Sequence, residues 1–312
     1  MGLIDFILNL AGLLLWLNWR SQRFDPLGKR IPVTLIGTLR RAEPRRLRRW
    51  HLLAVLGGLL FLRAVLYWQI GPGIGWAAGK LELGATTLFF RSDSFGRILL
   101  FSVFSFGLTL GIFYLWLLLF SILAGPEPFH RLVRIQLGPI DRLPRWIKFV
   151  LPLVLAALLW WLASWPLSWL AVDAYSKAHL IPQITSPIHR LEESLVIGLG
   201  SYLAWKYAAG ALLVLYLLNS YIYFGRHPFW NYVSSEAQTL LKLLGAGLRI
   251  LWRFLTALLP RSSRLRSENI NFSPALKNAL ASLLNVLGIA LVFLFAELAE
   301  WGLRALYPKL PL

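Results

Sequence analysis

The chain has 312 residues, of which 57% are hydrophobic and 15% are charged, and it carries a formal net charge of +18. A soluble domain of this length cannot bury so many apolar side chains, whereas apolar runs of about 20 residues match the hydrocarbon core of a bilayer. The sequence contains no cysteine, which excludes disulfides, thiolate nucleophiles and cysteine-ligated metals. The composition therefore predicts an all-α, polytopic membrane protein.

Six apolar segments are long enough to cross a membrane, and they span residues 2–19, 51–70, 97–123, 146–172, 196–224 and 275–303. The first segment lacks the basic region and the cleavage site of a signal peptide, so we expect it to be retained. Residues 71–96 are rich in glycine and are predicted to form an external loop with a short β-like piece at 85–90, "ATTLFF". Residues 173–195 are predicted to form a second external loop.

The basic residues are distributed unevenly among the connections between these segments. Residues 18–50 contain ten Lys and Arg, residues 124–148 contain five and residues 225–273 contain seven. Residues 71–96 and 173–195 contain two each. The positive-inside rule therefore places the three basic connections in the cytoplasm and both termini outside.

Residues 237–259, "AQTLLKLLGAGLRILWRFLTALL", are apolar enough for a seventh span but carry one polar stripe along a helix. The stripe contains Lys242, Arg249 and Arg253, and three cations are costly at the centre of a bilayer. A helix that lies in the interface lets these cations reach lipid phosphates while its leucine face enters the acyl region. We therefore favour an interfacial or re-entrant helix over a spanning one.

A turn made of a polar residue, proline and an apolar residue recurs at Pro26, Pro128 and Pro228, at spacings of 102 and 100 residues. Each turn follows an apolar helix and precedes a basic stretch and a second apolar helix. This order predicts three repeat units, at 1–70, 97–172 and 196–312. The alternative is that unrelated prolines simply end spans, because proline disfavours helix in the residue before it.

The third unit resembles the YggT family of small bacterial membrane proteins. In that family, a polar-Pro-apolar turn precedes a basic amphipathic segment that ends near a proline, and an acidic-x-Ser-Pro signature opens the next span. The matching positions are Pro228, Phe229, Pro260, Asn271, Ser273 and Pro274 in the third unit, and Pro128 and Phe129 in the second. The chain has Asn271 where the family usually has Asp. It also has three units where typical members have two, and residues 1–70 match only weakly.

The resemblance implies a non-enzymatic accessory protein of the bacterial cytoplasmic membrane. The family is linked to membrane organisation, cell division, osmotic tolerance and, in plastid relatives, cofactor assembly on membrane complexes.

Anionic lipids are the predicted partners of the basic residues, and nucleic acid is not, because these residues flank apolar spans. Other membrane proteins, or a second copy of the chain, are the predicted partners of the spans. The residues expected to hold amphipathic segments on the lipid surface are Arg40, Arg41, Arg45, Arg46, Arg48, Arg49, Lys242, Arg249 and Arg253.

Among the ionisable residues within the predicted spans, we single out Arg63, Lys206, Glu297 and Glu300 as candidates for a functional role. Such residues often mark ion pathways, so the alternative function is a small transporter or channel that uses Lys206 and Glu297. The two glutamates share one helical face and can pair with Arg63 or Lys206. Arg63 and Glu300 lie near span ends, where snorkelling explains them. The five histidines lack the spacing of metal ligands, so we predict no metal, cofactor or catalytic site.

Overall fold

The structure is a computed structural model of the whole chain, and it describes residues 2–24, 49–71, 73, 78–83, 87–91, 94–123, 129–169, 187–222, 229–243 and 274–306. Within these ranges, six helices are long and apolar enough to cross a membrane. The chain is therefore a polytopic α-helical membrane protein, as its composition predicts. The helices are α1 (Gly2–Phe24), α3 (Arg49–Ile70), α4 (Phe95–Leu123), α6 (Arg145–Trp169), the continuous unit α7–η4–α8 (Pro187–Gly200, Ser201–Ala204 and Trp205–Tyr221) and α10 (Pro274–Leu306).

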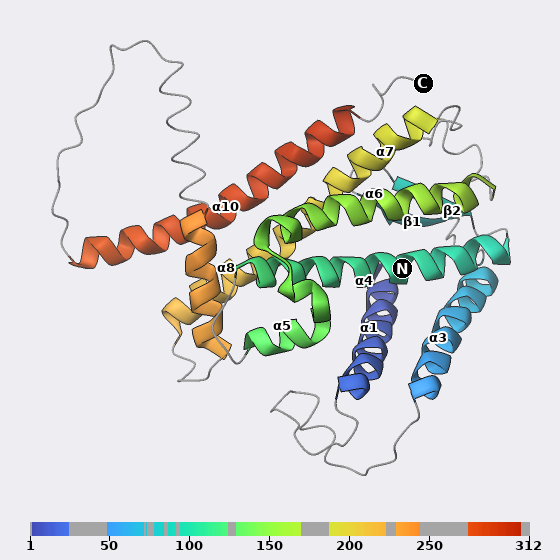
Figure 1. Cartoon of the computed structure of the whole chain (residues 1–312), viewed down its shortest axis with the longest axis horizontal. Coiled ribbons are helices and arrows are strands. Elements are labelled where there is room, and N and C mark those ends of the chain that lie inside the picture. The colour runs from blue at the N-terminus through green and yellow to red at the C-terminus, as the bar shows by residue number, and fades with distance from the viewer. Residues whose placement is uncertain are drawn as a thin grey trace.

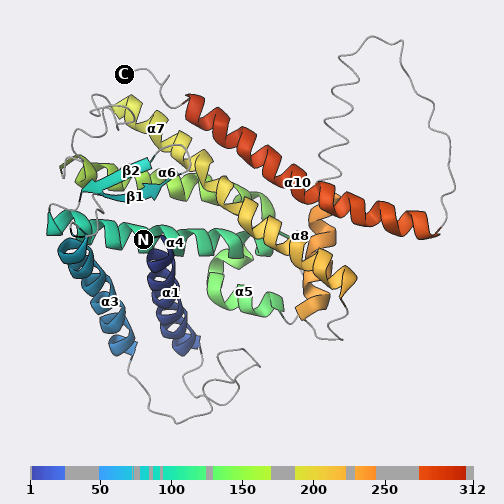
Figure 2. The same ribbon diagram turned by 180° about the vertical axis from the view of Figure 1, so that it is seen from behind.

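Helix α4 is the central element of the fold. It packs against α1 and α3, and also against α6 and α8. In both views α1 and α3 descend side by side from α4, while α6 runs alongside it (Figures 1 and 2). Helix α10 packs against α8 and lies on the other side of the molecule from α1 and α3 (Figure 1). The spans thus form a branched assembly around α4 and not a parallel bundle.

A β-hairpin lies between α3 and α4, within the region predicted as the first external loop. Strands β1 (Ala78–Glu82) and β2 (Thr87–Arg91) pair antiparallel, with Leu81 opposite Leu88. Leu81, Leu88 and Phe90 are buried in a cluster with Phe101 of α4. Gly79 permits this close approach, since a Cβ atom there would lie 2.8 Å from the Phe101 ring. Residues 71–96 therefore include a packed hairpin that covers one end of α4.

The fifth span begins earlier than the sequence predicts. Helix α7 starts at Pro187, so residues 187–195, which we expected to be part of the second external loop, are helical. Polar residues at this end of α7, including Glu192 and Glu193, ended the apolar run in the sequence. Glu193 is buried in the structure, so tertiary packing extends the helix beyond the apolar window.

A 3-10 segment, η4, interrupts this span near its centre. Two indole hydrogen bonds join the segment to α4: Trp116 Nε1 donates to the Ala204 carbonyl at 2.8 Å, and Trp205 Nε1 donates to the Leu115 carbonyl at 3.0 Å. Within a bilayer, backbone polar groups need partners from the protein because water is absent. The two tryptophans supply such bonds at the interruption and fix α8 against α4.

Two short helices follow the second and third predicted turns. Helix α5 (Phe129–Leu137) begins directly after Pro128, and residues 229–243, which follow Pro228, are helical. The 229–243 helix packs against α4 and α8 in an apolar cluster. Both prolines lie outside the described residues, and the three-unit repeat stays a prediction.

Candidate functional site

Lys206 of α8 forms two ion pairs with α10. Its Nζ atom lies 3.0 Å from Glu297 Oε1 and 2.9 Å from Glu300 Oε2. Arg304 Nη2 contacts the other oxygen of Glu300 at 2.6 Å. The two glutamates reach the same lysine because positions three apart lie on one face of a helix. Of the two cations that the sequence offered to these glutamates, Lys206 is the one that pairs with them.

The position of Lys206 deep within its span explains why its charge is paired. Lys206 stands at the middle of the 32-residue span Arg190–Tyr221 and is only 8% exposed. An unpaired charge at such a position is costly in hydrocarbon. Two carboxylates and two cations make the cluster formally neutral. Glu300 is 19% exposed and Glu297 is 64% exposed, so Glu300 is the more enclosed partner.

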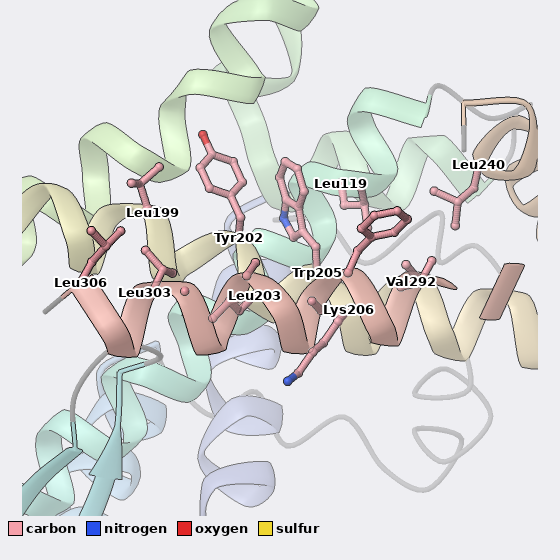
Figure 3. A pocket seen from close by; sticks show the side chains of 15 residues that line it. Leu119, Leu199, Tyr202, Leu203, Trp205, Lys206, Leu240, Val292, Leu303 and Leu306 are labelled. Carbon is pink, nitrogen blue, oxygen red and sulfur yellow. The ribbon is translucent and has the colours of Figure 1, made fainter. Parts of the chain in front are cut away.

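An apolar groove of about 580 Å³ borders the cluster. Its walls come from α4, the α7–η4–α8 span, the 229–243 helix and α10, and they include Leu119, Leu199, Tyr202, Val292 and Leu303. The Lys206 ammonium points away from the rings of Tyr202 and Trp205, which line the same groove (Figure 3). A permeation path for ions needs polar groups along its walls. This groove offers hydrocarbon instead, and the lysine is turned towards its carboxylates.

A second charge cluster joins α1, α3 and α4. Arg63 is 1% exposed and contacts Asp5 Oδ1 at 2.6 Å, Asn9 Oδ1 at 2.8 Å and Ser105 Oγ at 3.0 Å. Tyr67 donates a hydrogen bond to the same Asp5 oxygen at 2.5 Å. The expectation that Arg63 snorkels to the membrane surface is therefore wrong. Its guanidinium turns inward, because polar side chains of α1 and α4 supply partners for it. These partners cannot be recognised from the sequence of α3 alone.

A third cluster lies at the junction of α4, α5, η2 (Gly138–Arg142) and α6. Lys148 Nζ contacts Ser121 Oγ at 2.7 Å and Asp141 Oδ1 at 3.4 Å. Ser121 donates to Asp141 at 2.6 Å, and Arg134 contacts the other Asp141 oxygen at 3.2 Å. This cluster was not predicted from the sequence. The signal was Asp141 itself, one of two acidic residues in a connection, 124–148, that carries five Lys and Arg.

Few of the residues predicted to bind lipid fall within the described chain. Lys242 is exposed on the 229–243 helix. Arg49 is the first residue of α3 and is described by its backbone only. The others lie outside the described residues, and they are Arg40, Arg41, Arg45, Arg46, Arg48, Arg249 and Arg253.

The residues of the family motif are also only partly described. Phe229 packs against the apolar cluster between α4, α8 and the 229–243 helix. Phe129 and Pro274 are the first residues of α5 and α10, and proline suits the first turn of a helix. Pro128, Pro228, Asn271 and Ser273 lie outside the described residues.

Across the described ranges, no three His, Asp or Glu side chains gather where they could hold a metal ion. What the fold and the clusters define is a multi-pass helical membrane protein whose spans are joined by buried ion pairs. Comparisons with known proteins found no matching family model, no matching curated protein and no matching solved structure. The YggT resemblance therefore rests on the sequence motifs alone.

Proposed function

We propose that the protein is a non-enzymatic accessory or scaffold protein of the bacterial cytoplasmic membrane. The observation that carries this proposal is that three buried cations each pair with a carboxylate of another element. Arg63 joins α3 to α1, Lys148 joins α6 to η2, and Lys206 joins α8 to α10. Charges used in this way hold helices together and leave the outer faces of the spans apolar, which suits contact with lipid and with partner helices.

The resemblance to the YggT family suggests the processes in which such a scaffold acts. They are membrane organisation, cell division, osmotic tolerance and the assembly of membrane complexes. In this proposal the three basic connections lie in the cytoplasm, both termini lie outside, and the partners are other membrane proteins or a second copy of the chain.

The basic segments dock on anionic lipid in this proposal. The 229–243 helix supports the idea, because it packs one face against α4 and α8 while Lys242 is exposed. Arg249 and Arg253 continue the basic stripe along the sequence. Each basic residue near an anionic membrane surface contributes about 1 kcal/mol of attraction, so three such residues favour docking appreciably.

Lipid docking is testable with one fluorescent label, because the chain has no cysteine of its own. A Leu243→Cys protein carrying an environment-sensitive dye is placed in nanodiscs of phosphatidylcholine with or without phosphatidylglycerol. We expect anionic lipid to shift the emission to the blue, and Lys242→Gln/Arg249→Gln/Arg253→Gln to remove that shift. Lys80→Gln, which removes one exposed cation from β1, is the control. An unchanged shift in the triple variant would refute docking by these residues.

The scaffold role itself is tested by crosslinking in native membranes, followed by affinity purification. We expect a membrane protein, or a second copy of the chain, to be crosslinked in near-stoichiometric amount, both with the native chain and with Lys206→Met/Glu297→Gln. Recovery of uncrosslinked single chains alone would contradict the scaffold proposal.

A small transporter or channel that uses Lys206 and Glu297 is the second candidate. One observation favours it: Lys206 lies two residues after η4, and interrupted helices near the membrane centre often carry substrate sites. The apolar groove beside the pair speaks against an aqueous path. Proteoliposome flux assays with protons and monovalent cations separate the two candidates. A flux that Lys206→Met abolishes would replace the scaffold proposal by this one.

A further inference from the structure

The 229–243 helix has a carboxylate at the centre of its apolar face. Glu236 is 1% exposed, and the residues that share its face are Tyr232, Val233, Ala237 and Leu240, all buried. This face packs against Leu119 and Leu123 of α4 and against Leu212 and Leu213 of α8. The opposite side of the helix is polar and exposed at Asn231, Gln238 and Lys242.

Neither carboxylate oxygen of Glu236 has a hydrogen-bond partner in the described part of the chain. The surrounding cluster contributes Leu119, Phe120 and Leu123 from α4, Leu212, Leu213 and Tyr216 from α8, and Ile289 and Val292 from α10. Within this described cluster the titratable neighbours are thus tyrosines: Tyr216, and Tyr232 one turn earlier on the same helix. Lys206, the cation of α8, is paired with Glu297 and Glu300 instead.

A buried carboxylate without partners strongly favours its neutral form, because the ionised form loses its hydration and gains nothing in return. Burial raises the pKa of Glu236 from 4.5 to about 7. Burial and the neighbouring Glu236 together raise the pKa of the Tyr232 hydroxyl, so the tyrosine stays neutral and cannot offset the charge. A proton on Glu236 is therefore the simplest ligand that stabilises this helix in its packed position.

We propose that Glu236 is a proton-binding site, and that uptake of one proton on its carboxylate holds the 229–243 helix against α4 and α8. Loss of that proton loosens the helix from its cluster. The proposal concerns helix packing only and does not depend on lipid docking by the basic residues.

The direction of the pH effect follows from the raised pKa. When the helix is loose, Glu236 is hydrated and titrates near 4.5; when the helix is packed, it titrates near 7. Packing is therefore strongest below pH 4.5, weakens as the pH rises from 4.5 to about 7, and then levels off. A pKa difference of about 2.5 limits the change in the packing equilibrium to about 300-fold.

Hydrogen exchange on the full chain tests the proposal. The protein is placed in nanodiscs of phosphatidylcholine, which remove any contribution of anionic lipid, and exchange is corrected for the intrinsic pH dependence of amide chemistry. We expect the corrected protection of residues 232–240 to fall at least tenfold between pH 4.5 and 7.5. Protection of residues 101–106 in α4 should stay constant, which separates local loosening from global unfolding.

Two variants complete the experiment. Glu236→Gln, a neutral mimic of the protonated acid, should keep high protection of residues 232–240 at every pH. Glu82→Gln removes an exposed carboxylate from β1 and should behave like the native chain. Protection that does not change with pH in the native chain, or a pH dependence that persists in Glu236→Gln, would overturn the proposal. Failure of the lipid-docking test would leave it intact, because no anionic lipid is present here.

Discussion

Removing both carboxylates that face Lys206 should destabilise the protein more than removing Lys206 itself. The variant Glu297→Gln/Glu300→Gln leaves a buried ammonium that has no other carboxylate in ion-pairing contact among the described residues. The variant Lys206→Met leaves Glu300 paired with Arg304 and leaves Glu297 largely exposed. The loss of stability therefore depends on whether the ammonium or a carboxylate is left without a partner.

The magnitude follows from distance and burial. Opposite charges about 4 Å apart attract by about 4 kcal/mol at the effective dielectric constant of a protein surface. The contact of Lys206 with Glu297 contributes under about 1 kcal/mol, because single polar contacts between membrane helices seldom contribute more. The more enclosed contact with Glu300 contributes most, and a buried charge left alone costs about 3–5 kcal/mol. Measured polar contacts between membrane helices average only about 0.6 kcal/mol, so we expect about 2–3 kcal/mol for the double variant and about 1 kcal/mol for Lys206→Met.

The assay is equilibrium unfolding in mixed micelles with increasing dodecyl sulfate, followed by tryptophan fluorescence. The decisive variant combines all three changes, since Lys206→Met in the Glu297→Gln/Glu300→Gln background removes the stranded ammonium. We expect the triple variant to be more stable than the double variant. If the triple variant is equally stable or less stable, the Lys206 ammonium is not the group that is stranded, and the reasoning fails.

Two further changes test the packing of the other helices by the same unfolding assay. Asp5→Asn should cost about 3 kcal/mol, because it leaves the buried guanidinium of Arg63 without its carboxylate; a loss below about 1 kcal/mol would show that the neutral partners of Arg63 suffice. Gly198→Ala should cost about 1–3 kcal/mol, since its Cβ atom would lie 2.8 Å from the Leu153 carbonyl oxygen of α6. Gly57→Ala meets nothing within 4 Å and should be neutral or stabilising by up to about 1 kcal/mol, so equal effects of the two glycine changes would contradict this account.

The six spans were predictable because membrane insertion depends on local apolar length, which the sequence displays directly. The elements that were not predicted from the sequence depend on contacts between segments. Strand β1, "AGKLE", has little β-propensity of its own and gains its place by pairing with β2 and packing on α4. Helix α7 extends to Pro187 with the buried Glu193 inside the fold, which an apolar window does not detect.

The charge clusters also have a part that is predictable from local sequence and a part that depends on contacts between helices. Lys206, Glu297 and Glu300 were visible because they interrupt apolar runs, and the helical spacing of the two glutamates made a shared partner plausible. The inward orientation of Arg63 was not visible, because its partners come from two other helices. Glu236 was missed because we followed the polar stripe of Lys242, Arg249 and Arg253. The sequence did contain a signal for Glu236, because this acidic residue lies among apolar residues on the face opposite to the polar stripe.

The 3-10 segment Ser201–Ala204 changes the rotational phase of the span that contains it. Four residues turn the chain by about 400° in an α-helix but by about 480° in a 3-10 helix. The stripe that α7 presents to α6 is therefore offset by about 80° from the stripe that would continue along α8, and α8 directs its side chains to α10 instead. One span thus packs mainly on α6 along α7 and mainly on α10 along α8, in addition to its contact with α4. Deleting a single residue of the segment would rotate α8 by about 120° and turn Lys206 away from Glu297 and Glu300.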